Sequence, residues 1–205
     1  MASKPELGRR ESNKLEKRAR LREAAEKLFR RRGYEQTTTR EIADAAGIAT
    51  GTLFLYARDK QDLLFLVMHE HLRVTVDEAF ATLPRKVKLR GALRHLFSKL
   101  YAMYGRHEAL ARPFVSGLTG ATGPNAIEVN ALTFLFLQRI ATLVENAQRT
   151  GEVRDDVEPL AIATVCFELY FTALLRWLSG LATIEQLPDV VTTSLQLLFE
   201  GISAD

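Results

Sequence analysis

Residues 37–64 read TTTREIADAAGIATGTLFLYARDKQDLL, and this stretch decides the fold. Thr38 and Glu41 have the spacing of a capping box, which predicts a short helix over residues 39–46. Gly47 permits the left-handed backbone that reverses a chain, so a second short helix can follow at once. Two short helices joined at a glycine turn are typical of a helix-turn-helix, whose second helix enters the major groove of DNA.

The side chains of this motif divide into an inner and an outer set. Small Ala43 and Ala46 let the two helices approach closely, while Leu53 ties the second helix, predicted over 50–56, to the core. The outer side chains are short hydroxyls and apolar groups of a size that can meet base edges or thymine methyls. They are Thr50, Thr52 and Phe54, with Leu55 at the edge.

Apolar periodicity predicts helices along the rest of the chain. A helix over 14–32 precedes the motif, with Gly33 as its stop, and a helix over 62–83 follows it. No stretch alternates with period two for long enough to indicate a sheet, so we predict an all-α fold. The remaining predicted helices span 87–104, 107–117, 125–150, 157–180 and 188–203.

Charge and cysteine content restrict the class of protein. Residues 1–62 carry 15 Lys and Arg against 10 Asp and Glu, whereas the remainder carries 13 against 15. Positive charge concentrated at one end indicates a polyanionic partner there. A single cysteine excludes an intramolecular disulfide framework and, with a polar N-terminus that lacks a signal peptide, predicts a cytoplasmic protein.

Two other classes of protein are disfavoured. No HExxH, GxSxG, CxxC or Walker pattern occurs, and His95 and His107 are isolated in the chain, so we predict neither an enzyme nor a cofactor or metal site. A helical small-molecule-binding or membrane-surface protein without DNA binding is the alternative. Charges of both signs alternate on the basic first helix, and Glu168 and Arg176 interrupt the most apolar stretch, so we expect no membrane partner.

The stretch beginning at Gly33 closely resembles the DNA-binding region of the tetracycline-repressor (TetR) family of transcription regulators. That family shows a Gly-aromatic start, a Thr-rich cap, an Ile-Ala pair, an Ala-Gly-Val turn, a Gly-Thr-Leu-Tyr recognition helix, a Tyr-Phe end and a following lysine. Here these features appear as Gly33-Tyr34, Thr37-Thr38, Ile42-Ala43, Ala46-Gly47-Ile48, Gly51-Thr52-Leu53-Phe54, Tyr56-Ala57 and Lys60.

The chain departs from the family pattern at two positions. Ala49 replaces the usual Ser or Thr cap of the recognition helix, which removes about 1 kcal/mol of capping. Thr50 is the candidate to take over as cap, which would move the start of the helix by one residue. Ala57 replaces an aromatic residue, which predicts looser packing under the recognition helix.

The resemblance implies a set of DNA contacts. Implied phosphate contacts come from Thr38, Arg40, Tyr56 and Lys60, and implied groove contacts from Thr50, Gly51, Thr52, Phe54 and Leu55. Simpler roles stay open for some of them: Tyr56 as a core residue, Arg40 as a solvated one, and Thr38 as a helix cap that can also bind DNA. Lys4, Arg9 and Arg10 of the N-terminal arm reach the minor groove or belong to a solvated tail.

The resemblance also implies three parts of the chain and two further partners. The parts are a disordered basic arm over 1–13, a helix-turn-helix DNA-binding domain over 14–62, and a helical ligand-binding and dimerisation domain over 63–205. The helices at 157–180 and 188–203 would form a four-helix bundle with a second copy, although they could instead fill an intrachain core. As a homodimer, the protein would bind double-stranded operator DNA at two half-sites.

The resemblance further implies a ligand cavity within residues 87–180, and the aromatic residues of this region fit a small, largely apolar or aromatic effector. Binding there would favour a conformation that releases operator DNA, with the helix over 62–83 as the lever. Individual members of the set could equally be core residues. The candidate lining residues are Phe97, Tyr101, Tyr104, Phe114, Asn130, Phe134, Phe167, Glu168, Phe171 and Trp177.

Overall fold

The computed structural model describes residues 8–201, and within this range every regular element is a helix. This agrees with the predicted all-α fold. The elements are α1 (Arg9–Arg32), α2 (Thr39–Ala46), α3 (Thr50–Leu53), α4 (Lys60–Ala81), α5 (Leu89–Arg106), α6 (Glu108–Ser116), α7 (Pro124–Arg149), α8 (Pro159–Leu178), the 3₁₀ helix η1 (Ile184–Gln186) and α9 (Leu187–Glu200).

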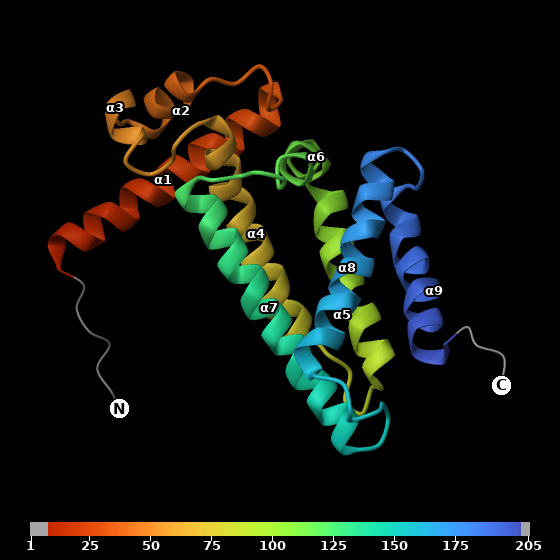
Figure 1. The fold of residues 1–205 in the computed structure, drawn as a ribbon. Helices are drawn as coiled ribbons and strands as arrows, with labels where there is room; N and C mark the ends of the chain where they lie inside the picture. Colours follow the sequence, from red (N-terminus) through yellow and green to blue (C-terminus); the bar gives the residue numbers. More distant parts are fainter. Residues whose placement is uncertain (1–7, 202–205) are drawn as a thin grey trace.

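The N-terminal helices form a small unit on top of the longer ones. Helix α1 crosses the N-terminal ends of α4 and α7, and α2 and α3 pack on its outer side (Figure 1). Helix α1 buries Leu21, Ala25 and Phe29, which belong to one apolar core with Ile42 of α2 and Leu53 of α3. The N-terminal helices are therefore held together by a shared core.

The remaining helices pack around α4. Helix α7 runs alongside α4, and α5, α8 and α9 complete a bundle next to this pair (Figure 1). Near its N-terminus α4 has contacts with α1, α6 and α7, and all residues from Asp62 to Met68 are buried. A helix buried on every side belongs to the core of both regions. The predicted domain boundary between residues 62 and 63 thus falls inside a continuous, enclosed helix.

Several predicted helix bounds were wrong. Helix α1 begins at Arg9, so residues 9–13 are helical instead of disordered; the rest of the predicted arm, including Lys4, lies outside the described residues. The recognition segment is helical only over Thr50–Leu53 and continues as a turn. Glu11 in the first turn of α1 accounts for part of the early start, since acidic side chains stabilise helix N-termini.

Helices α7 and α8 are long and apolar enough to span a membrane. Both nevertheless pack along other helices, α7 on α4 and α8, and α8 on α9. The charged residues Glu168 and Arg176 each lie on the exposed side of α8, among apolar neighbours. The hydropathy of α8 reflects one face in the core and a second face that is exposed.

Candidate nucleic-acid interface and ligand cavity

The predicted capping box is present at the start of α2. The Thr38 side chain accepts a hydrogen bond from the backbone N–H of Glu41 at 3.3 Å, and the Glu41 carboxylate accepts one from the backbone N–H of Thr38 at 2.9 Å. The hydrogen bonds that the Glu41 carboxylate accepts from the backbone N–H and the hydroxyl of Thr38 lower its pKa, and an ion pair with Arg32 of α1 adds to the effect. The start of α2 is therefore fixed both by its own cap and by α1.

The turn between α2 and α3 is held from α1. Gly47 adopts the left-handed conformation, with φ 65° and ψ 40°. The Arg20 guanidinium of α1 donates to the carbonyl oxygens of Ala46 and Gly47, and a Cβ atom on Gly47 would lie only 2.6 Å from it. Glycine is thus required at this turn for its backbone and for the close approach of Arg20.

Helix α3 presents a small, mixed surface to solvent. Leu53 and Ala57 are buried beneath it, whereas Phe54 and Leu55 are 50% and 79% exposed. Gly51 is exposed, and Thr50 and Thr52 are half-buried. Since Phe54 and Leu55 contribute little to the core, their exposure leaves them available for contacts outside the chain.

Helix α3 lacks a side-chain cap, as the sequence predicted, but its first residue is not shifted along the chain. Ala49 is the N-cap, without a side-chain hydrogen bond, and Thr50 is the first helical residue. The prediction that Thr50 replaces the missing cap is therefore wrong. Ala57, in place of a large aromatic residue, is fully enclosed in the core.

The candidate phosphate-binding side chains beside this surface differ in their exposure and in their contacts. Arg40 is exposed, and Tyr56 is half-buried and packs against the core. The Lys60 ammonium lies 4.4 Å from the centre of the Tyr34 ring and donates to the carbonyl oxygens of Tyr34 and Glu35 at 2.9 and 3.1 Å. Lys60, which also lies 3.9 Å from the Glu35 carboxylate, thus fixes the loop after α1 to the start of α4.

A cavity of about 200 Å³ lies between helices α4, α5, α6, α7 and α8. Its walls are apolar, and its few polar groups include the Tyr104 and Tyr170 hydroxyls, which are 3.4 Å apart. Burial raises the pKa of Tyr104 to about 12, so that this hydroxyl stays neutral. The predicted residues that line the cavity are Tyr104, Phe114, Asn130, Phe167 and Phe171.

The other five predicted lining residues lie elsewhere. Phe97 and Tyr101 stack on Tyr170 from the core side, and the Tyr101 hydroxyl donates to the Tyr170 carbonyl oxygen at 3.0 Å. Trp177 is buried beneath the Arg112 guanidinium, 4.6 Å from its ring centre. Phe134 and Glu168 are exposed to solvent. Aromatic content alone could not separate the faces of these helices.

Comparisons with known proteins agree with this geometry. Residues 21–67 match the family model described as "Bacterial regulatory proteins, tetR family". These residues therefore form a DNA-binding region of the TetR type.

Relatives of similar length extend the likeness over nearly the whole chain. The fatty acid metabolism regulator protein of Bacillus subtilis is 22% identical over 88% of this chain and 92% of its own length. Thermus thermophilus FadR, a TetR-family repressor crystallised with lauroyl-CoA, is 29% identical, with a TM-score of 0.74 over 92% of this chain and 96% of that one. Bacillus subtilis FadR, crystallised with stearoyl-CoA, has a TM-score of 0.69 at 20% identity, over 90% and 99%.

These comparisons determine the class of function. The chain is a ligand-responsive, DNA-binding transcription regulator, and not an enzyme. The alternative of a helical small-molecule-binding or membrane-surface protein without DNA binding finds no support.

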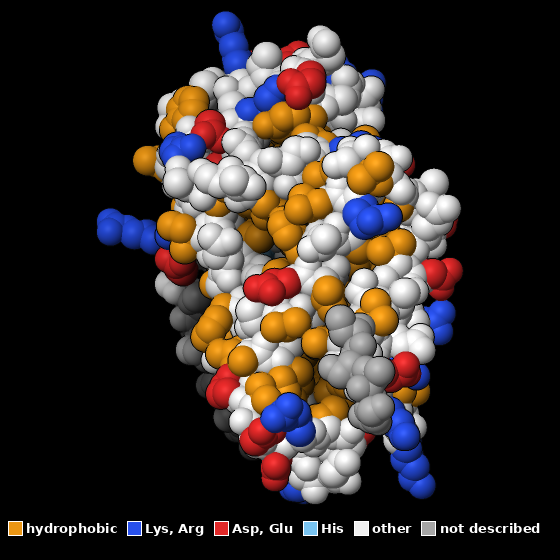
Figure 2. All heavy atoms as spheres, turned by 45° about the vertical axis from the view of Figure 1, so that its right-hand side comes forward, with side chains coloured by type: hydrophobic (Ala, Val, Ile, Leu, Met, Phe, Trp, Pro, Cys, Tyr) orange, Lys and Arg blue, Asp and Glu red, His pale blue; other side chains and the backbone are white. Residues whose placement is uncertain are grey.

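The C-terminal helices carry a broad apolar surface. The face with α8 and α9, turned forward in Figure 2, shows hydrophobic side chains in a band with charged groups mostly around it. We call this surface the α8–α9 band. Its exposed members are Val165 and Leu175 of α8, Leu181 of the connecting loop, and Leu197 and Leu198 of α9.

One buried polar cluster was missed by sequence reasoning. The buried carboxylate of Asp62 accepts hydrogen bonds from the backbone N–H groups of Arg58, Asn125 and Ala126 at 3.0 to 3.2 Å. The Asn125 side-chain amide donates to Asp62 and to the Tyr56 carbonyl oxygen, at 3.1 and 2.9 Å. The N-terminus of α7 is thereby tied to the end of the recognition segment, and we call this cluster the Asp62 anchor.

The Asp62 anchor could not be derived from spacing, because its partners lie in distant parts of the chain. One residue type in the sequence reflects this cluster, namely the glycine at position 123. A Cβ atom there would lie 2.0 Å from the nearer Asp62 carboxylate oxygen, so a larger residue would displace the carboxylate. Arg18 of α1 donates to the Asn125 side-chain oxygen at 3.0 Å, so that α1 joins the cluster as well.

Proposed function

We propose that this protein is a repressor whose affinity for operator DNA is lowered by a long-chain acyl thioester of coenzyme A. The observation that carries the proposal is the apolar cavity between α4 and α8, which has the lining needed for a hydrocarbon chain and few polar groups. The lauroyl-CoA and stearoyl-CoA bound by two FadR relatives support this ligand class. Since both operator DNA and CoA thioesters occur in the cytoplasm, we place the protein there.

The size of the cavity suggests how the ligand acts. At about 200 Å³ it is smaller than the roughly 300–1,000 Å³ of an ordinary ligand site. A long acyl chain would therefore fill this cavity, and we propose that lining helices such as α7 and α8 move apart to admit it. A ligand that binds the widened state better shifts the population toward it.

The Asp62 anchor offers a route from the cavity to DNA. Helix α7 lines the cavity with Val129, Asn130 and Thr133, and one turn earlier its Asn125 holds the Tyr56 carbonyl oxygen. A displacement of α7 would therefore act on the end of the recognition segment. The buried part of α4, which shares Asp62, would move with it.

The DNA contacts proposed for this chain follow the exposure of its side chains. Phe54 and Leu55, with the half-buried Thr50 and Thr52 and the exposed Gly51, would meet the major groove. Thr38, Arg40, Tyr56 and Lys60 would contact phosphates, which position the protein without reading sequence. Arg9 and Arg10, in the first turn of α1, would extend this basic surface.

We propose that the α8–α9 band is covered by a second copy of the chain. A surface with exposed apolar side chains from two adjacent helices and the loop between them fits a self-complementary, two-fold interface. Such a dimer would present two recognition segments to half-sites about 34–36 Å apart.

The decisive experiment measures operator release. A palindromic duplex is first selected from a random pool with the purified protein, and its binding is followed by fluorescence anisotropy at fixed salt. We expect lauroyl-CoA or stearoyl-CoA to weaken binding at least tenfold, while CoA and free laurate do not. Selection of a duplex that none of these acyl-CoAs releases would contradict the proposed ligand class, and failure to select any duplex would contradict the assigned DNA interface.

A matched pair of substitutions tests the cavity. The hydroxyls of Thr133 and Thr142 each donate to the carbonyl oxygen four residues earlier on α7, but only Thr133 lines the cavity. Thr133→Phe should fill the cavity and abolish the response to lauroyl-CoA while DNA binding stays intact. Thr142→Phe should respond as the parent protein does; equal responses of the two variants would place the ligand elsewhere.

A second pair tests the route through the Asp62 anchor. Asn125→Ala should leave lauroyl-CoA binding measurable by calorimetry but reduce its effect on operator affinity. Asn146→Ala, on the exposed side of the same helix, should leave both unchanged. Full coupling in the Asn125→Ala protein would show that the signal takes another path.

A further inference from the structure

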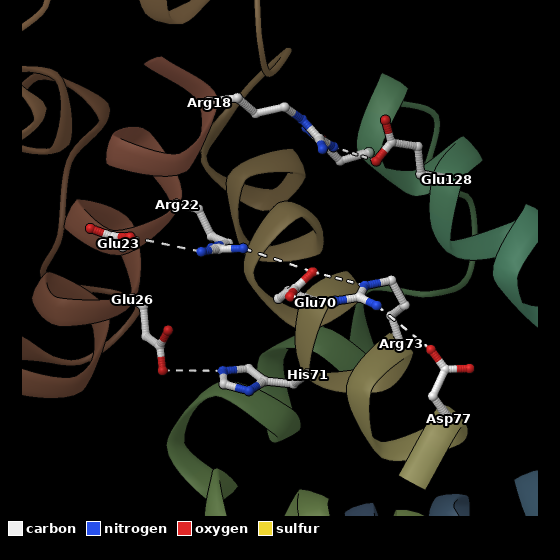
Figure 3. Close-up of polar contacts among 10 residues, drawn as sticks. Arg18, Arg22, Glu23, Glu26, Glu70, His71, Arg73, Asp77 and Glu128 are labelled. Carbon is white, nitrogen blue, oxygen red and sulfur yellow. Dashed lines mark hydrogen bonds and ion pairs between the residues drawn. The ribbon is translucent and has the colours of Figure 1, made fainter. Parts of the chain in front are cut away.

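Three side chains with metal-binding chemistry meet where α1 packs against the ligand-binding region. Glu26 lies on α1, His71 on α4, and His107 at the junction of α5 and α6. One ligand atom from each lies within 4.8 Å of the other two. Figure 3 shows Glu26 and His71 pointing toward one another across the space between their helices, and their nearest atoms are 3.1 Å apart.

Each of these side chains comes from a firmly placed backbone position. Glu26 and His71 lie in the interiors of long helices. The backbone N–H of His107 donates to the carbonyl oxygens of Met103 and Tyr104, and its own carbonyl oxygen accepts from Leu110 and Ala111. The imidazole rings of His71 and His107 have their centres 4.0 Å apart. The cluster therefore brings three ligands from three elements into reach of one ion.

We propose that Glu26, His71 and His107 bind a zinc ion that bridges the DNA-binding unit and the ligand-binding region. Two imidazoles and one carboxylate are a ligand set that Zn²⁺ accepts, with water in the fourth position. Tetrahedral bonds of about 2.0–2.2 Å place neighbouring ligand atoms roughly 3.3 Å apart. The 3.1 Å between the Glu26 carboxylate oxygen and His71 Nε2 is close to this spacing.

Arg30 is the group that competes with an ion at this place. Its guanidinium donates to His107 Nδ1 at 3.1 Å and lies 3.6 Å from the Glu26 carboxylate. About half of the Arg30 side chain is exposed, since its accessible fraction is 49%. It can therefore turn into solvent when a divalent ion takes its place, and its removal should strengthen metal binding.

The sequence predicted no metal site, because His71 and His107 are far apart in the chain. The fold brings their two rings together where α1, α4 and α6 meet. An ion held there would fasten α1, and with it the recognition segment, to α4. This inference does not depend on the acyl-CoA proposal, because none of the three residues lines the cavity.

The test measures metal binding directly, without DNA or acyl-CoA. The full-length, tag-free protein is treated with a chelator and titrated with Co²⁺, whose visible absorption reports tetrahedral coordination, and Zn²⁺ is then added to displace it. We expect one ion per chain. Absence of the tetrahedral band, or Co²⁺ that Zn²⁺ does not displace, would overturn the proposal.

Substitutions assign the ligands. His71→Ala, His107→Ala and the nearly isosteric Glu26→Gln should each weaken Co²⁺ binding about tenfold or more. His69→Ala is the matched control, because it removes a histidine from the same helix that lies outside the cluster. Arg30→Ala should bind Co²⁺ more tightly than the parent protein.

Two outcomes of this series would overturn the assignment. The first is an equal loss of Co²⁺ binding in the His69→Ala protein, and the second is parental Co²⁺ affinity in both the His71→Ala and His107→Ala proteins. Circular dichroism checks that each variant is folded. If a histidine variant does not fold, the Glu26→Gln and Arg30→Ala proteins still test the metal site.

Discussion

Two surfaces of this regulator leave large apolar side chains in solvent, and they differ in extent. At the end of α3, Phe54 and Leu55 stand alone in a region where basic residues outnumber acidic ones. On α8 and α9, the exposed apolar side chains are Val165 and Leu175 of α8, Leu181 of the connecting loop, and Leu197 and Leu198 in the last turn of α9. The first surface is small and adjoins positive charge, whereas the second extends over two helices and the loop between them.

The difference in extent suggests different partners. A stable protein interface buries about 800 Å² on each partner, which two side chains cannot provide. Two apolar groups are enough, however, to meet thymine methyls in a groove where phosphate contacts supply most of the affinity. The α8–α9 band is of the kind that a second subunit covers, and so each surface has its own consequences when it is changed.

The register of α8, on which the band depends, can be tested through its one cysteine. Burial raises the pKa of Cys166 to about 12, although Val165 beside it is exposed. At pH 8 the fraction of reactive thiolate should then be about 1,000-fold lower than for an ordinary thiol. Alkylation by iodoacetamide, followed by mass spectrometry, should be slower by about this factor in native protein than in urea. Equal rates would mean that α8 presents a different face.

The next largest effect is expected when the α8–α9 band is charged. Val165→Glu combined with Leu197→Glu would bury unpaired carboxylates in a dimer interface, at a cost of several kcal/mol. We expect a monomer by light scattering and a loss of operator affinity of about 100-fold or more, because a monomer reaches one half-site. Ile127→Glu, at an exposed apolar position on α7, should remain dimeric. If the double variant stayed dimeric, the α8–α9 band would not be the dimer interface.

A smaller effect is expected at the recognition segment. Phe54→Ala should weaken operator binding about tenfold, since one good base contact contributes about 1–3 kcal/mol. The melting temperature should change little, because half of the side chain is already in solvent. Ile127→Ala supplies the control for loss of an exposed apolar group. Unchanged DNA affinity in the Phe54→Ala protein would sharply weaken the distinction between the two surfaces.

The smallest effect concerns the bare start of α3. Ala49→Ser should give this helix the side-chain cap that it lacks and raise the free energy of unfolding by about 0.5–1 kcal/mol. Calorimetry should then show a melting temperature about 1–4 °C higher. Ala45→Ser, on the exposed side of α2, should bring no gain because serine is a poorer helix former than alanine. No gain from Ala49→Ser would argue that Ala49 is not the N-cap.

Local patterns in the sequence predicted the elements that local chemistry determines. The capping box of Thr38 and Glu41 and the left-handed turn at Gly47 each depend on neighbours within a few positions. Most of the longer helices were placed to within a few residues for the same reason. The early start of α1 was missed because its first turns, such as those at Ser12 and Asn13, expose polar side chains and carry no apolar pattern.

What the sequence could not supply depends on contacts between distant segments. The Asp62 anchor joins α4 to α7, and His107, isolated in the chain, stacks on His71. The aromatic residues of α5 show the same limit: Phe97 and Tyr104 are both buried, but only Tyr104 lines the cavity. The helix that packs opposite each residue decides between cavity and core, and periodicity carries no information about it.

The enclosure of α4 has a consequence for protein engineering. Because the helix from Asp62 to Met68 is buried by neighbours on every side, cutting the chain at residue 62 would expose an apolar surface on both fragments. A chimera that joins the N-terminal DNA-binding helices to a foreign ligand-binding domain must therefore include α4. The junction between the two proteins belongs in the exposed loop near Pro84. The N-terminal helices and α4 thus form one part that a chimera must keep together.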